Sequence, residues 1–122
     1  MLDGLRILLV EDDPIVRGLY VSILQDAGAV VVSSGLATEA VGLIDLQTPD
    51  AVVTDLQMPE RDGIWLLKEL QARLPGVPVI AVSGYLHEAG LVDLQRLGFF
   101  DVLAKPIRLS LLSQTVARAA GR

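Results

Sequence analysis

The chain reads RILLVEDDP from Arg6 to Pro14, an apolar run followed at once by three acids and a proline. An unbroken series of Val, Ile and Leu is typical of a parallel strand that is covered on both faces. Asp13 and Pro14 favour the start of a helix, because aspartate caps helix N-termini and proline suits the first helical position. This stretch therefore predicts a strand that leads directly into a helix.

The same alternation recurs along the whole chain. Segments with helical spacing of apolar residues lie between five short runs, four of which are nearly continuous in Val, Ile, Leu and Ala. These runs are Arg6–Val10, Val30–Ser33, Ala51–Thr54, Val77–Val82 and Asp101–Ala104. Strand–helix alternation with short connections implies a parallel sheet with helices on both faces. We therefore predict one α/β domain over residues 1–122, built from five strand–helix units.

Capping residues and the spacing of apolar residues predict where the remaining helices begin and end. The second helix is predicted to run from Ala37 to Gln47, and Asp62 is predicted to cap the third. The fourth helix is expected to end at Gly98 and the fifth to follow Pro106, with apolar residues at helical spacing that include Leu97 and Leu109, respectively.

Composition excludes several classes of protein. The 122 residues contain no cysteine and one histidine, His87, which excludes disulfide frameworks, zinc–thiolate sites and multi-histidine metal clusters. The net charge of -5 disfavours direct binding to nucleic acid. Mean hydropathy is high at +0.52, yet no uncharged apolar run approaches the roughly 18 residues that a membrane span needs. Residues 1–4 do not resemble a secretory signal, so we expect a cytoplasmic protein.

Polar side chains follow the predicted strands at the points where they end. Glu11 and Asp12 follow the first run, Asp55 the third, Ser83 the fourth and Lys105 the fifth. Ligands of open α/β sheets bind at the carboxyl ends of the strands. We therefore expect acids, a hydroxyl and a lysine to meet at one edge of the sheet.

Carboxylates that converge in this way repel one another. Each pair at about 4 Å costs on the order of 4 kcal/mol at an effective dielectric near 20. Protonation of one group or a bound cation would relieve this repulsion. An all-oxygen site suits a hard ion such as Mg²⁺. A carboxylate beside Mg²⁺ and a lysine is also a plausible phosphoryl acceptor, because both cations neutralise charge on the transferred group.

Four stretches of the chain resemble the receiver domain of two-component response regulators. They are Ile7–Pro14, Asp55–Gly63, Val79–Gly84 and Lys105-Pro106, and they occur in the family's order at the predicted strand ends. The resemblance extends over essentially the whole chain. It implies a flavodoxin-like, doubly wound (βα)5 fold with strand order 2-1-3-4-5.

The resemblance also implies a phosphoacceptor and a metal site. Asp55 would accept the phosphoryl group from the phosphohistidine of a sensor kinase, from a histidine phosphotransfer protein or from a small acyl phosphate. Asp12 would bind Mg²⁺ directly and Glu11 would lie close to the ion, through water. Asp55 would contribute to the same site, and Gln57 would supply its backbone carbonyl.

The remaining matched positions concern contacts with the phosphoryl group and the conformational response to phosphorylation. Lys105 would contact the phosphoryl group, Ser83 would move to donate a hydrogen bond to it, and a cis peptide bond would join Lys105 to Pro106. Val102 occupies a position that is often aromatic in the family, which excludes an aromatic relay there. Tyr85 occupies a variable position that tunes dephosphorylation in the family.

The implied function is a switch and not a metabolic enzyme, since the domain would catalyse only its own phosphorylation and dephosphorylation. The face made by the fourth helix, fifth strand and fifth helix would meet an output partner or a second copy of the chain. The alternative is a degenerate receiver that acts as a docking module without phosphorylation. A haloacid-dehalogenase-type phosphatase is disfavoured because Gln57 replaces its second aspartate. The sequence also lacks the glycine-rich loop of a nucleotide binder. His87 is expected to be exposed and inert.

Overall fold

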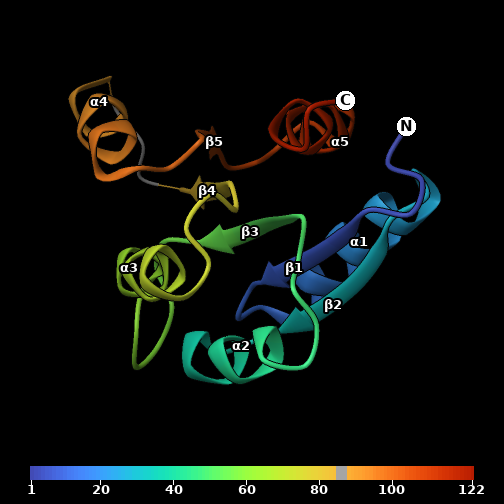
Figure 1. Ribbon diagram of the computed structural model, residues 1–122. Coiled ribbons are helices and arrows are strands. Elements are labelled where there is room, and N and C mark those ends of the chain that lie inside the picture. Colours follow the sequence, from blue (N-terminus) through green and yellow to red (C-terminus); the bar gives the residue numbers. More distant parts are fainter. Residues whose placement is uncertain (85–87) are drawn as a thin grey trace.

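A parallel sheet of five strands forms the centre of the computed structural model, which describes residues 1–84 and 88–122 (Figure 1). Its strands are β1 (Arg6–Val10), β2 (Val30–Ser34), β3 (Ala51–Asp55), β4 (Val79–Ser83) and β5 (Asp101–Ala104). They lie in the order β2-β1-β3-β4-β5, and all neighbours are parallel. The predicted flavodoxin-like α/β fold and its strand order are confirmed.

Helices cover both faces of the sheet (Figure 1). They are α1 (Pro14–Asp26), α2 (Ala37–Ile44), α3 (Gly63–Arg73), α4 (Glu88–Leu97) and α5 (Leu109–Ala119). Residues of α1 and α5 share one apolar cluster with the sheet, and those of α2, α3 and α4 share the other. No helix among the described residues is long and apolar enough to cross a membrane.

The alternation of side chains along each strand divides the core. On β1, Ile7 and Leu9 belong to the cluster of α1 and α5, whereas Leu8 and Val10 belong to the opposite cluster. This follows from the period of two in a strand, which sends successive side chains to opposite faces. Because both faces are covered, the central strands read as unbroken apolar runs.

Several element bounds differ from the predictions. Strands β2, β3 and β4 each extend one residue further, to Ser34, Asp55 and Ser83. Strand β4 begins at Val79 and not at Val77, whose amide N–H donates to Leu74 in the turn after α3. These extensions place two of the predicted site residues within strands and not after them.

Helix α2 ends at Ile44, three residues before the predicted end at Gln47. The chain then turns so that Asp50 can pair with Arg6: its amide N–H donates to the Arg6 carbonyl at 2.7 Å, and its carboxylate accepts from the Arg6 amide at 2.8 Å. These bonds begin the approach of β3 to β1. The helix therefore stops early because the chain must reach the sheet.

Leu97 and Leu109, two of the apolar positions at helical spacing, are exposed. Each lies at an end of its helix, beyond the part that packs on the sheet. Val30 and Val32 are exposed as well, because β2 is an edge strand that neighbouring elements cover incompletely.

Candidate functional site

The carboxyl edge of the sheet gathers the predicted site residues. Glu11 follows β1, Asp55 ends β3, Ser83 ends β4, and Lys105 follows β5. The three strands that supply Glu11, Asp55 and Ser83 are neighbours in the sheet, and β5 lies beside β4. Parallel pairing therefore brings together residues that are far apart in the sequence.

Lys105 bridges two carboxylates from different strands. Its Nζ donates to Oε1 of Glu11 at 2.8 Å and to Oδ2 of Asp55 at 2.9 Å. The two acids are only 1% and 5% exposed, so the carboxylate ends of these ion pairs are shielded from water, whereas Lys105 is partly exposed. Burial alone would lower the pKa of Lys105, but its hydrogen bonds with Glu11 and Asp55 raise it well above the ordinary value. Lys105 is therefore a permanent ammonium in this site.

Glu11, Asp12 and Asp55 form a compact acidic cluster. One oxygen from each lies within 4.8 Å of the others. Three carboxylates against one ammonium leave two formal negative charges uncompensated within this group. The all-oxygen donor set and this excess charge fit a divalent hard cation such as Mg²⁺.

The loop between β1 and α1 gives its two aspartates different roles. The carboxylate of Asp13 accepts from the amides of Ile15 and Val16, which confirms it as the helix cap. Asp12 is exposed and belongs to the acidic cluster. Loss of hydration, together with a hydrogen bond to Glu11 and the charge of Glu11, raises the pKa of Asp12. The loop thus assigns Asp13 to the helix and Asp12 to the acidic cluster.

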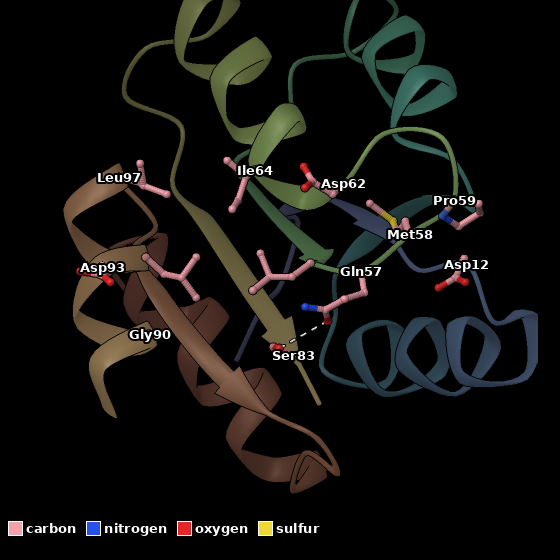
Figure 2. Close-up of a pocket in the computed structure, with 12 residues that line it drawn as sticks. Asp12, Gln57, Met58, Pro59, Asp62, Ile64, Ser83, Gly90, Asp93 and Leu97 are labelled. Carbon is pink, nitrogen blue, oxygen red and sulfur yellow. Dashed lines mark hydrogen bonds between the residues drawn. The ribbon is translucent and has the colours of Figure 1, made fainter. Parts of the chain in front are cut away.

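Gln57 and Ser83 lie on the open side of the site (Figure 2). The hydroxyl of Ser83 donates to Oε1 of Gln57 over a long 3.4 Å. With Asp12, both residues line a cavity of about 760 Å³ that extends between the start of α3 and helix α4. The cavity leaves room for a ligand beside the acidic cluster.

Gly63 lets the loop after β3 fold back against the strand end. Its amide donates to the Leu56 carbonyl at 2.9 Å. A Cβ at Gly63 would lie 2.5 Å from the carbonyl oxygen of Asp55, so this position has no space for a side chain. Glu60 has a positive φ of 68° in the same loop. Asp62 caps α3 by accepting from the Trp65 amide, as predicted.

Sequence reasoning missed the roles of Gly63 and Arg17. Arg17, on α1, donates from Nη1 to the backbone carbonyl of Glu11 at 2.8 Å. A glycine or an arginine alone carries no local signal for such a contact. Only the packing of separate elements reveals it.

Three further positions bear on the predictions. The Lys105-Pro106 peptide bond is cis, as the resemblance implied. Val102 is buried in β5 among apolar neighbours. Tyr85 and His87 lie outside the described residues.

Comparison with known proteins identifies the relatives of this chain. A sequence model described as "Response regulator receiver domain" matches residues 7–117. An uncharacterized 14.6 kDa protein of Leptolyngbya boryana is 38% identical over 103 residues, which are 83% of this chain and 79% of that protein. The Regulator of RpoS of Escherichia coli K12 is 35% identical over 105 residues, or 86% of this chain but only 31% of the relative.

The solved structures agree with these relatives. The receiver domain of the Francisella response regulator 1452 superposes with a TM-score of 0.91 at 27% identity, and the match covers 98% of both chains. Nearly every element described above therefore has a counterpart in that domain.

Proposed function

The chain belongs to the response regulator receiver domains of two-component signalling systems, and from this premise we propose that Asp55 is its phosphoacceptor. The observation that carries the proposal is the bridge from Lys105 to Asp55 and Glu11 at the carboxyl edge of the sheet. It sets the Lys105 ammonium beside the buried carboxylate of Asp55. The residues next to Asp55 in the site, among them Gln57 and Ser83, line the open cavity. A receiver domain is a signalling module and not a metabolic enzyme.

In the proposed reaction, a carboxylate oxygen of Asp55 attacks the phosphorus of a phosphohistidine. The P–N bond breaks, its electron pair stays on the imidazole, which takes up a proton, and Asp55 becomes an acyl phosphate. Lys105 is already within 2.9 Å of the acceptor, so its charge stabilises the oxygens of the transferred group without large rearrangement.

The acidic cluster would hold Mg²⁺ during this transfer. In the proposed arrangement Asp12 and Asp55 bind through carboxylate oxygens, Glu11 lies close through water, and Gln57 contributes its backbone carbonyl. Mg²⁺ when bound offsets negative charge on the phosphoryl group. The two uncompensated charges of the cluster support this assignment.

Ser83 supplies the first step of the switch. Its hydroxyl donates over 3.4 Å to Gln57, a long bond that is readily exchanged for a shorter one to a charged phosphoryl oxygen. Phosphorylation would then shift a two-state equilibrium through β4 and the elements beside it.

The face of α4, β5 and α5 is the proposed output surface. Phe100, just before β5, is a large apolar residue that lies exposed there. Arg118 of α5 stacks over the Phe100 ring at 5.7 Å and donates to Asp101 at 2.7 Å, so this surface combines apolar contacts with fixed charges. Such a surface suits an output domain, an effector protein or a second copy of the chain.

A protein phosphodonor, either a sensor histidine kinase or a histidine phosphotransfer protein, must reach the same edge of the sheet. An apolar pocket of about 390 Å³ lies beside Lys105 and includes Leu19 of α1 and Leu109 of α5 in its lining. Both leucines are exposed. A Leu19→Glu variant should therefore lose transfer from a protein donor while it keeps phosphorylation by a small acyl phosphate.

Intact mass measured with Mg²⁺ and a small acyl phosphate tests the acceptor. The parent and an Asp26→Asn control, altered at an exposed acid of α1, should each gain one phosphoryl group, whereas Asp55→Asn should gain none. A parent that shows neither an adduct nor Mg²⁺-dependent binding of beryllium fluoride contradicts the proposal. A docking module that acts without phosphorylation would then be the better description.

A further inference from the structure

We propose that Arg17 is a positioning residue for the Mg²⁺ site, acting through the main chain of Glu11. This inference rests on the proposed function, since it concerns how the acidic cluster is held in shape to bind its cation. Arg17 is outside the acidic cluster and comes from α1. Its guanidinium Nη1 donates to the Glu11 carbonyl at 2.8 Å in a partly buried position.

The backbone of Glu11 is fixed from two directions. Its amide N–H donates to the carbonyl of Ser34, at the end of β2, at 3.0 Å. Its carbonyl accepts from Arg17. Glu11 follows the last residue of β1, so β2 still supports its amide N–H while Arg17 supports its carbonyl. The arginine therefore adds a second support at the point where the chain leaves the sheet.

The orientation of Asp12 depends on this support. A peptide group is planar, so a fixed Glu11 carbonyl also fixes the plane that carries the Asp12 amide. On the other side, the amide of Asp13 donates to Oε2 of Glu11 at 3.2 Å, and the Asp13 side chain caps α1. Asp12 is thus an exposed residue between two anchored neighbours, Glu11 and Asp13. This anchoring directs the Asp12 carboxylate toward those of Glu11 and Asp55.

Gly35 provides the space that the arginine needs. A Cβ at Gly35 would lie 2.8 Å from Nη1 of Arg17 and 3.9 Å from the Glu11 carbonyl oxygen. The nearest atom belongs to the end of a flexible side chain and not to backbone. Gly35→Ala should therefore displace the guanidinium while the fold is retained.

Whether removal of Arg17 weakens or strengthens Mg²⁺ binding distinguishes a positioning role from a purely electrostatic one. If Arg17 acted only as a positive charge near the cluster, its removal would strengthen the binding of a cation. If it holds the loop in shape, its removal weakens binding. Outer groups that orient metal ligands typically contribute about tenfold or more to metal affinity.

The test is the Mg²⁺ affinity of the full chain, measured by calorimetric titration with magnesium chloride. Arg17→Met and Gly35→Ala should each weaken binding about tenfold. In the Arg17→Met background, Gly35→Ala should cause no further loss, because the atom that its Cβ meets is gone. The control is Gly42→Ala on α2, where a Cβ meets nothing within 4 Å. This variant should bind Mg²⁺ as the parent does.

Unfolding by urea without Mg²⁺ shows whether a variant is folded. If Arg17→Met does not fold, the comparison of Gly35→Ala with Gly42→Ala decides. Unchanged or tighter Mg²⁺ binding in folded Arg17→Met or Gly35→Ala overturns the inference, as does an additive loss in the double variant. A parent that binds no Mg²⁺ contradicts the proposed function itself, so the two failures are distinguishable.

Discussion

The acidic site has two halves that differ in how firmly the chain holds them. The ion-paired half consists of Glu11, Asp55 and Lys105, with both carboxylates buried and contacts of 2.8 and 2.9 Å to the ammonium. The cavity half consists of Asp12, Gln57 and Ser83, which line open space and include a 3.4 Å hydrogen bond. The first half is organised by contacts within the protein, whereas the second lines a cavity with room for a ligand.

The largest expected effect comes from breaking the ion-paired half. Lys105→Met leaves Glu11 and Asp55 as buried carboxylates without their ammonium, which should lower the free energy of unfolding by about 3–5 kcal/mol. Urea denaturation without Mg²⁺ measures this loss. Lys68→Met, at an exposed position of α3, should change stability by less than about 0.5 kcal/mol. Equal effects of the two changes would show that the bridge contributes nothing to the fold.

Mg²⁺ should stabilise the cavity half. At a concentration 100 times its dissociation constant, a ligand that binds only the folded state adds about 2.7 kcal/mol to the free energy of unfolding. Asp12→Asn removes one charge of the cluster, and a tenfold weaker affinity would reduce this gain at the same concentration to about 1.4 kcal/mol. Urea denaturation with and without Mg²⁺ gives both values. A gain that Asp12→Asn leaves intact would remove Asp12 from the metal site.

Gly63 links the two halves, because its loop joins Asp55 to Gln57 and returns to the strand end. Gly63→Ala places a Cβ against the rigid carbonyl of Asp55 and should lower the free energy of unfolding by about 1–3 kcal/mol. Gly42→Ala, which also adds a methyl group at a helical glycine, should instead stabilise the chain by up to about 1 kcal/mol. The two midpoints of urea denaturation should therefore move in opposite directions.

The smallest effect is expected at the side chain of Gln57. It is exposed and makes a long hydrogen bond, so Gln57→Ala should change the free energy of unfolding by less than about 0.5 kcal/mol. Mg²⁺ affinity should also persist, since the proposed ligand is the backbone carbonyl, which alanine retains. Calorimetric titration checks this point, and a large loss of affinity would reassign the metal contact to the side-chain amide.

Residues of both halves could be predicted from the sequence, because most of them stand at the ends of predicted strands. Unbroken apolar runs revealed the strands, and the polar residue at each strand end could then be assigned to one edge. Asp13 and Asp62 were identified as caps because capping depends on neighbours within three residues.

Contacts between separate elements could not be predicted in this way. The bond from Arg17 to the Glu11 carbonyl and the close approach of Gly63 to Asp55 depend on how helices and loops pack. The same limit explains Leu97 and Leu109, since helical spacing gives a face but not how far the neighbouring elements extend over it.

The bridge made by Lys105 also has a consequence for the order of assembly. Lys105 follows the last strand, and the bridge joins it to Glu11, which lies 94 positions earlier in the sequence, and to Asp55, which lies 50 positions earlier. During synthesis all three acids emerge before their cation, and long-range parallel pairing is slow. The proposed acceptor site is therefore completed only when β5 has joined the sheet. A partly synthesised chain offers its acids without the ammonium, so the complete ion-paired half is a mark of a finished fold.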